Sequence, residues 1–263
     1  MADPDFDSEP TSDTGKYLAM DMSPVDSDLA RGPSDRSDCL NNLYQRLPAT
    51  RKEQTAVAAV LRGELGLRVD EYSGSDAMES VAKFIDMAPR ILHLATHGYF
   101  CQNAQFSGET ELEENPLLYS GLIMSGGNRL IAGELGSGAG ANVEDGILTS
   151  LEASGLNLFG TELVVLSACQ TGLGQIENSE GVYGLCRAFQ LAGARSVIMS
   201  MFSVPDKSTV TLMERFYRDW LSGNSKASAL RQASLSILQE RRETHGAAHP
   251  LFWGGFILVG DPY

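Results

Sequence analysis

Two residues that could catalyse acyl transfer, His97 and Cys169, each come at the end of an apolar segment. His97 and Gly98 follow residues 90–96, and Cys169 follows residues 162–167 and precedes a glycine-rich turn. A thiolate nucleophile needs a base, usually imidazole, and donors for the developing oxyanion. We therefore expect His97 to activate Cys169 and the Gly98 N–H to act as a donor. From spacing alone, a packed core thiol and a structural histidine stay open as the alternative.

The elements that must position these residues alternate between apolar strands and helices. This alternation predicts an α/β fold with a mostly parallel central sheet flanked by helices. Ligands and chemistry in such sheets lie at the carboxyl ends of the strands, which is where His97 and Cys169 fall. The expected strands are 67–72, 90–96, 121–124, 162–167, 196–200 and 256–259; the expected helices are about 50–62, 75–87, 181–192, 206–221 and 225–241; capping boxes are expected at Thr50–Glu53 and Thr149–Glu152.

The N-terminal part of the chain differs in composition from the rest. Its first 40 residues hold ten acids and three bases, which is half of the net charge of -14. They are rich in Asp, Ser and Pro, so we expect residues 1–46 to form an acidic, largely irregular segment and residues 47–263 a single domain. An inhibitory segment, a linker and a simple tail stay open as roles for residues 1–40.

Composition excludes several function classes. The charge of -14 and a pI near 4.7 argue against direct nucleic-acid binding. No apolar run approaches the ~20 residues that cross a bilayer, and no signal peptide opens the chain, so we expect a cytoplasmic protein without membrane contact. The four cysteines form no C-x-x-C pair, and His93 and His97 would stand about 13 Å apart on a strand, so we expect neither a metal nor another cofactor.

Several sequence segments resemble the CHAT-domain family of caspase-like cysteine peptidases, which are related to separases and often attached to tetratricopeptide repeats. The strongest segments are LHLATHG at 92–98 and LVVLSACQTGLG at 163–174. Others follow in the expected order at 180–189, 192–197, 204–206, 249–250 and 260–262. The resemblance implies a three-layer caspase-like fold. It also implies that Cys169 is the nucleophile, His97 the general base, and the N–H groups of Gly98 and Cys169 the oxyanion hole.

The sequence departs from the family pattern at three points. Gln170 stands where the family usually has Glu, which removes any charged role at that position. The run Met201-Phe-Ser-Val204 replaces the usual Leu-Trp-Pro-Val, which alters the expected pocket wall. The chain carries no tetratricopeptide repeats, so we expect it to be a C-terminal portion of a longer protein.

Substrate contacts are expected near the same strand ends. Separase-like relatives hold a P1 arginine with acidic residues after a following strand, and Asp206 lies in the matching region. Ser203 and Ser167 complete the residues that we expect to contact the substrate. The alternative for Asp206 is that its carboxylate caps the next helix through the N–H of Ser208 or Thr209.

These observations predict a cysteine endopeptidase that cleaves a specific protein substrate. We expect a partner, an attached sensor or repeat domain, or a mobile loop within 101–146 to gate it in a bacterial defence or signalling pathway. The alternative is a catalytically silent caspase-like interaction or scaffold module. A flavodoxin-like nucleotide binder is disfavoured, because the glycines of 133–140 lack the Gly-Lys-Ser/Thr of a phosphate loop. His93 and Cys186 are expected in the core, and His249 in a structural loop.

Overall fold

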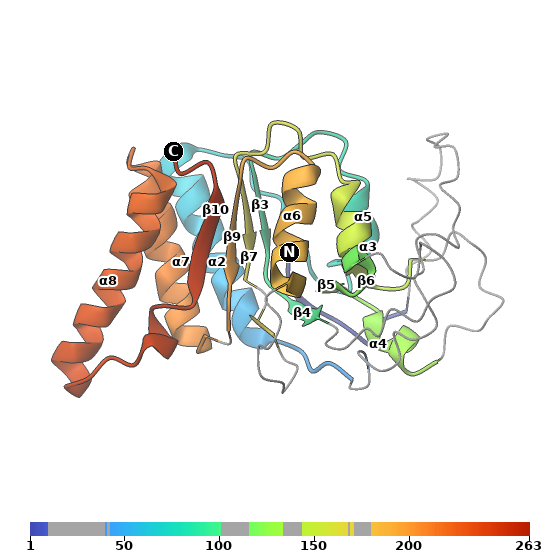
Figure 1. Cartoon of the computed structure of the whole chain (residues 1–263), viewed down its shortest axis with the longest axis horizontal. Coiled ribbons are helices and arrows are strands. Elements are labelled where there is room, and N and C mark those ends of the chain that lie inside the picture. The colour runs from blue at the N-terminus through green and yellow to red at the C-terminus, as the bar shows by residue number, and fades with distance from the viewer. Residues whose placement is uncertain are drawn as a thin grey trace.

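The chain forms a mixed α/β fold, shown in Figure 1. The structure is a computed structural model that describes residues 1–9, 40, 43–100, 116–133, 144–167, 169–170, 180–202 and 204–263. Its helices are α2 (Pro48–Leu65), α3 (Glu79–Lys83), α4 (Gly127–Ile131), α5 (Ser150–Ser154), α6 (Glu180–Leu191), α7 (Asp206–Leu221) and α8 (Lys226–His245), with 3-10 turns η3 (Pro116–Leu118) and η4 (Pro250–Phe252). Its strands are β1 (Ala2–Pro4), β2 (Ser73–Gly74), β3 (Ile91–Leu94), β4 (His97–Phe100), β5 (Ser120–Ile123), β6 (Ile147–Thr149), β7 (Leu163–Leu166), β8 (Cys169–Gln170), β9 (Ser196–Ser200) and β10 (Phe256–Gly260).

Two four-stranded sheets contain the central strands. The first has the order β10-β9-β7-β3, with β3, β7 and β9 parallel and β10 antiparallel at the edge. The second has the order β6-β5-β4-β8, in which β4 and β8 are parallel but β5 runs antiparallel to β4 and β6. The expectation of one mostly parallel sheet therefore holds only for the first sheet. The second sheet is mixed, because β5 runs antiparallel to both of its neighbours and only β4 and β8 are parallel.

The parallel strand pairs β3–β7 and β4–β8, one in each sheet, follow the same register. Ile91 pairs with Leu163, Leu94 with Leu166, and His97 with Cys169, so the offset between partners is 72 residues throughout. The Ser167 N–H donates to the Leu94 carbonyl at 2.9 Å, which extends the pairing one residue beyond the end of β7. The register of the first sheet therefore fixes the pairing in the second.

Helices cover both faces of the first sheet (Figure 1). On one face, Leu94, Val164 and Val197 pack in a buried cluster with α5 and α6. On the other face, Val165 and Ile198 pack in a second cluster with α2, α7 and α8. Successive strand residues point to opposite faces, so these nearly continuous apolar strands are buried from both sides.

The first nine residues belong to this fold, in contrast to the irregular segment expected for 1–46. β1 pairs with β2, Ala2 bridges Ala95, and the Phe6 side chain is fully buried. The Asp3 carboxylate, also buried, forms an ion pair with Arg46 at 2.7 Å. Apolar side chains within the acidic stretch and neutralisation of a buried acid allow this packing. Residues 10–39, which hold six of the ten acids of the first 40 residues, are outside the described residues.

The expected element boundaries were confirmed in part. The Thr149–Glu152 capping box is present, with the Glu152 N–H donating to Thr149 Oγ1 and the Thr149 N–H donating to Glu152. The box at Thr50 is wrong, because α2 begins two residues earlier at Pro48 and the Thr50 hydroxyl donates to the Leu47 carbonyl. A proline at the first helical position starts a helix as well as a capping box does.

Two further expectations at the start of the domain are wrong. Residues 67–72 form no strand, and the expected helix 75–87 is reduced to α3. Leu67 and Val69 instead pack their side chains against the cluster around α2. Alternating apolar residues here mark a loop with two partly buried side chains, because packing of alternate side chains does not by itself supply a strand with a pairing partner. Among the described helices, none combines the length and apolar character needed to span a bilayer.

Candidate active site

The tertiary structure brings His97 and Cys169 together. They are direct register partners in the parallel pair β4 and β8, whose backbones run about 4.8 Å apart. The sequence placed both residues just past a strand end, whereas each is the first residue of a further short strand. The chain stays extended after β3 because Ala95 bridges Ala2 of the N-terminal segment.

The hydrogen bond to the His97 ring identifies its tautomer. His97 is only 5% exposed, and its Nε2 lies 2.7 Å from the Gln45 carbonyl oxygen. A carbonyl can only accept, so Nε2 carries the proton and, in the neutral ring, Nδ1 carries the lone pair. Nδ1 is buried and has no hydrogen-bond partner among the described residues. Burial lowers the pKa of His97 and so favours the neutral ring. The hydrogen bond to the Gln45 carbonyl acts in the opposite direction, and its effect is the smaller of the two.

Three residues from the N-terminal segment surround this imidazole, and we call them the His97 enclosure: Phe6, Tyr44 and Gln45. The Phe6 and Tyr44 rings lie with their centroids 5.3 Å and 5.1 Å from that of His97. Sequence reasoning missed them because they lie in or next to the acidic stretch. The available signal was the presence of isolated aromatic residues in a polar segment that was expected to be irregular.

A buried carboxylate links the two strands just before the His97–Cys169 pair. Glu53 of α2 is 2% exposed, and its two oxygens lie 3.0 Å from His93 Nε2 and 3.0 Å from Ser167 Oγ. The other ring nitrogen of His93 lies 3.0 Å from the Tyr217 hydroxyl. We call Glu53, His93, Ser167 and Tyr217 the Glu53 network. In this network both ring nitrogens of His93 have partners, and Glu53 accepts the hydroxyl of Ser167, which the sequence analysis expected to contact the substrate.

Asp206, another residue that was expected to contact the substrate, lies at the carboxyl end of the first sheet, as His97 does. It is the first residue of α7, which follows the carboxyl end of β9, and it is exposed. The capping alternative for Asp206 is wrong: Pro205 is the N-cap, and its carbonyl accepts from the N–H of Ser208 and Thr209. Ser203 lies outside the described residues.

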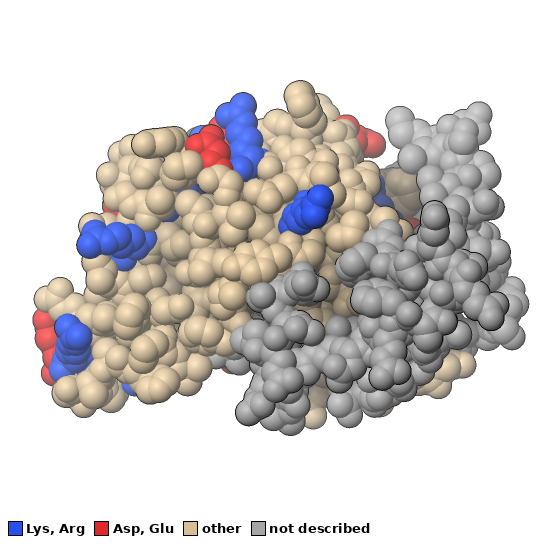
Figure 2. All heavy atoms as spheres, in the orientation of Figure 1, with Lys and Arg blue, Asp and Glu red and all other residues tan. Residues whose placement is uncertain are grey.

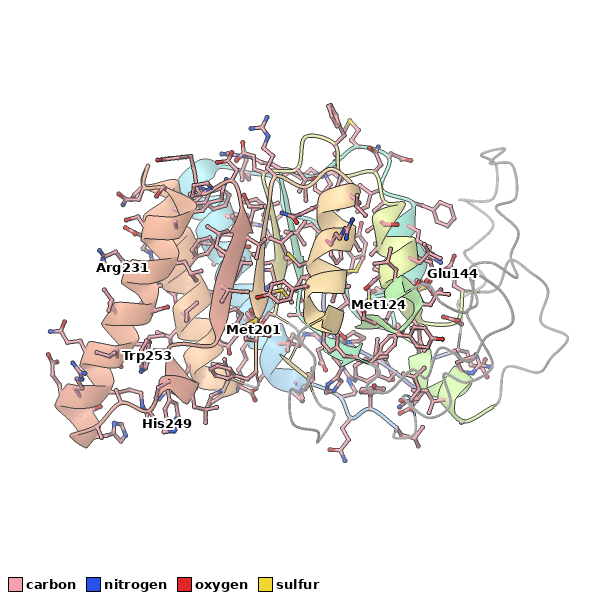
Figure 3. All side chains as sticks on the ribbon, viewed as in Figure 1. Met124, Glu144, Met201, Arg231, His249 and Trp253 are labelled. Atoms are coloured by element: carbon pink, nitrogen blue, oxygen red, sulfur yellow. The ribbon has the colours of Figure 1, made fainter. Side chains whose placement is uncertain are left out.

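The other candidate residues lie in structural settings. Cys186 is a free, buried thiol whose pKa is raised to about 11 by burial, so it is a core residue as expected. His249 lies beside the end of α8 (Figure 3), and its Nδ1 accepts the Leu251 N–H at 3.2 Å, as a structural loop histidine should. Cys39 and Cys101 are outside the described residues. No group of three metal-ligating side chains occurs in the described part of the chain.

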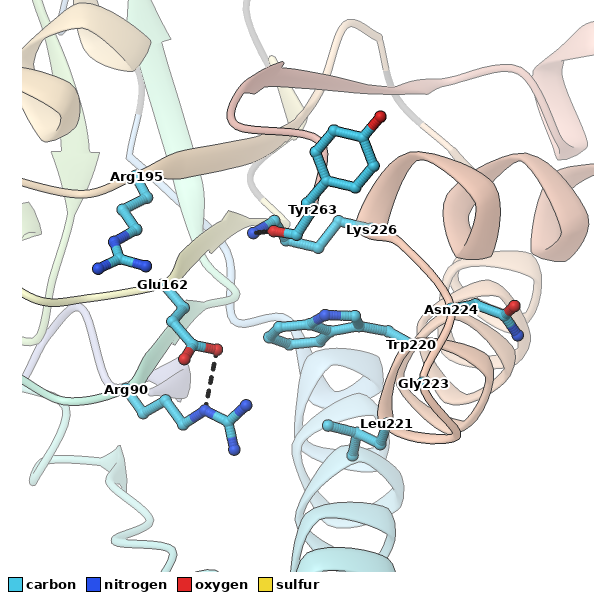
Figure 4. Close-up of a pocket in the computed structure, with 9 residues that line it drawn as sticks. All are labelled: Arg90, Glu162, Arg195, Trp220, Leu221, Gly223, Asn224, Lys226 and Tyr263. Atoms are coloured by element: carbon cyan, nitrogen blue, oxygen red, sulfur yellow. Dashed lines mark hydrogen bonds and ion pairs between the residues drawn. The ribbon is translucent and has the colours of Figure 1, made fainter.

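A pocket of about 360 Å³ lies at the opposite end of the first sheet (Figure 4). Arg90, Glu162 and Arg195 line it, and each immediately precedes one of the strands β3, β7 and β9. Arg90 Nε and Glu162 are 2.9 Å apart. His97 lies beyond the carboxyl end of β3, so this pocket is separate from the candidate active site. On the face shown in Figure 2, the described Lys and Arg side chains are scattered.

Comparison with known families agrees with this arrangement. The family model of the CHAT domain matches residues 1–261, which is nearly the whole chain and includes the ordered residues 1–9. The chain belongs to the CHAT domain family. This CHAT domain is 33% identical over 115 residues to tetratricopeptide repeat protein 28 of Mus musculus. It is 32% identical over 115 residues to the protein of the same name from Homo sapiens. Each match covers 44% of the chain and 4% of the relative.

Proposed function

We propose that this chain is a cysteine endopeptidase with Cys169 as the nucleophile and His97 as the general base. The observation that carries the proposal is the direct pairing of His97 with Cys169. The second support is the state of the imidazole, because Nε2–H is engaged by Gln45 and Nδ1 is left without a described partner. A buried ring nitrogen that keeps its lone pair is the group that a neighbouring thiol needs.

The proposed reaction follows from these positions. The Cys169 thiol transfers its proton to Nδ1 of His97, and the thiolate attacks the scissile carbonyl carbon. When the tetrahedral intermediate collapses, the C–N bond breaks and the departing amine takes the proton from Nδ1. Water then loses a proton to His97, attacks the thioester and releases the acid product and the free thiol. During both steps the Gln45 carbonyl holds Nε2–H and keeps the ring in one orientation.

The proposed oxyanion donors are the backbone N–H groups of Gly98 and Cys169. Gly98 lies in β4 between two strands, since it pairs with Leu122 on one side and Gln170 on the other. This position holds its backbone rigidly beside the nucleophile. Asp206 and Ser203 remain the proposed residues for a basic or neutral P1 side chain, and Asp206 is exposed beyond the carboxyl end of β9.

We propose further that the α/β core is the three-layer caspase-like fold, which the two helix-covered faces of the first sheet support. The substrate is a protein, and no metal or other cofactor is required by the proposed reaction. A partner or an attached repeat domain gates the enzyme, and the tetratricopeptide repeat relatives support this part. A cytoplasmic defence or signalling role completes the proposal.

The test is cleavage of a diverse peptide library by the purified chain, with Cys169→Ala and Cys186→Ala compared side by side. Cleavage should disappear in Cys169→Ala and persist in Cys186→Ala, because Cys186 is a buried core thiol. Alkylation of the wild-type chain gives a second measurement, in which Cys169 should react much faster than Cys186. Cleavage that persists in Cys169→Ala would overturn the proposal.

The second candidate function is a catalytically silent interaction module, which the similarity to tetratricopeptide repeat proteins favours. Absence of cleavage together with slow alkylation of Cys169 would support it. Absence of cleavage with fast, selective alkylation of Cys169 would instead indicate a competent site that awaits its activator.

A further inference from the structure

Asn128 of α4 forms hydrogen bonds to Phe6 and Tyr44, two of the three residues of the His97 enclosure. It is 4% exposed, and its backbone N–H donates to the Phe6 carbonyl at 3.0 Å. Its side-chain Oδ1 accepts the Tyr44 N–H at 2.8 Å, and its Nδ2 donates to the Tyr44 carbonyl at 3.0 Å. The second Nδ2 hydrogen reaches the Asp7 carboxylate at 2.8 Å.

These contacts hold both aromatic residues of the His97 enclosure. Asn128 fixes the backbone of Phe6 and both backbone polar groups of Tyr44, and these two rings lie on the imidazole. Gln45, whose carbonyl accepts the His97 Nε2–H, is the residue directly after Tyr44. The Tyr44 carbonyl belongs to the peptide unit that joins these two residues, so its bond to Asn128 restrains that unit next to the Gln45 carbonyl.

We propose that Asn128 is a positioning residue that holds His97 in its Nε2–H tautomer by fixing the Tyr44–Gln45 backbone. The inference rests on the proposed role of His97 as the general base. An amide is required here because the site presents one donor, the Tyr44 N–H, and two acceptors, the Tyr44 carbonyl and the Asp7 carboxylate. Asn matches that set, whereas the isosteric carboxylate of Asp offers no donors.

The first variant is Asn128→Asp, with Asn157→Asp as the matched control, because Asn157 is exposed on the loop after α5. Asn128→Asp should lose the bonds to the Tyr44 carbonyl and Asp7 and place two carboxylates together. We expect at least a tenfold fall in kcat/KM or in the alkylation rate of Cys169. Nitrogen-15 NMR of the His97 ring should show the Nε2–H tautomer in the wild type and a mixture in Asn128→Asp. Asn157→Asp should match the wild type in each measurement.

A second variant separates positioning from folding. The exchange Asp7→Asn with Asn128→Asp restores a donor between positions 7 and 128 and removes the repulsion, but it leaves the Tyr44 carbonyl without its donor. We expect the thermal stability to recover relative to Asn128→Asp while the tautomer mixture and the slow alkylation remain. Recovery of the single Nε2–H tautomer in the exchange variant would overturn the inference. So would an unchanged tautomer and reactivity in Asn128→Asp.

The two proposals can fail separately. The ring tautomer is measured without any cleavage, so a wild-type chain that neither cleaves peptides nor alkylates rapidly at Cys169 would contradict the peptidase, while the tautomer would still decide the role of Asn128. A wild-type peptidase with Asn128→Asp equal to it in tautomer and rate would keep the catalytic proposal and remove Asn128 from it.

Discussion

His97 and Cys169 are register partners although 72 residues separate them in the chain. The pairing continues the ladder that aligns Ile91 with Leu163, so the apolar strands β3 and β7 determine it. A one-residue slip in that ladder would move every side chain of one strand to the opposite face. The burial of both faces opposes such a slip, and the alignment of the proposed catalytic pair is therefore a property of the core.

The His97 enclosure predicts an unusual pH dependence. Burial is the larger influence on this ring and lowers its pKa below the ordinary 6.5. His97 should therefore stay neutral, and able to accept a proton, to below pH 6.5. Tyr44→Ala should let water reach the ring and raise its pKa toward 6.5, as measured by NMR titration of the His97 ring. Tyr183→Ala, at an exposed position on α6, is the control. A lower pKa in Tyr44→Ala would contradict this prediction.

The Glu53 network predicts a large loss of stability in Glu53→Ala. The substitution removes the acceptor for His93 Nε2–H and for the Ser167 hydroxyl. Ser167 is buried, and the His93 side chain is largely buried. We expect the free energy of unfolding to fall by about 2 to 5 kcal/mol. Denaturant unfolding measures this loss, with Lys52→Ala, the exposed neighbour, changing stability by less than about 0.5 kcal/mol. Equal effects of the two substitutions would show that the network does not stabilise the fold.

The carboxylates around Lys83 predict a change of stability with pH. Glu79 lies 2.5 Å from Lys83 and accepts the Gly146 N–H at 3.1 Å, while Glu144 and Glu152 approach the same ammonium. Burial and these neighbouring acids raise the pKa of Glu79 well above its ordinary value of 4.5.

The folded chain therefore binds the Glu79 proton more tightly than the unfolded chain. The stabilising contribution is complete below about pH 4.5 and is lost as the pH rises through the raised pKa of the folded state. Glu79→Gln resembles the protonated side chain, so its Tm relative to the wild type should increase as the pH rises from 4.5. Thermal melts across that range provide the measurement. A Tm difference that stays constant or decreases would contradict the raised pKa.

Two glycines predict opposite effects of the same substitution. A Cβ on Gly121 of β5 would lie 2.5 Å from the Leu148 carbonyl oxygen and 2.8 Å from the Tyr99 ring, whereas one on Gly63 of α2 meets nothing within 4 Å. Gly121→Ala should destabilise the protein by about 1 to 3 kcal/mol, since β5 and β6 must separate. Gly63→Ala should stabilise it by about 0.5 to 1 kcal/mol through helix propensity. Chemical denaturation checks both, and a loss in both variants would contradict the distinction.

Local sequence rules succeeded where a segment carries its own structural signal. The strand at 196–200 and the helix at 206–221 have the expected bounds, and the Thr149–Glu152 capping box forms. Periodicity failed at 67–72 and 75–87. An alternation of apolar residues indicates which side chains are buried, whereas a strand or helix also needs packing or pairing partners that lie elsewhere in the chain. Charge composition did not indicate that residues 1–9 pack against the domain, because it does not show which side chains, such as Phe6, are buried.

The sequence by itself determined the family, the α/β character and the two candidate catalytic residues, since each is encoded in a short motif or a local pattern. Only the tertiary structure decided that His97 pairs with Cys169 and that Gln45 sets the tautomer of the ring. It also decided that Glu53 joins the strands upstream and that Asn128 holds the His97 enclosure. Such contacts join residues 40 to 114 positions apart, and hydrogen bonds at that separation depend on how the chain packs, which no local pattern of residues records.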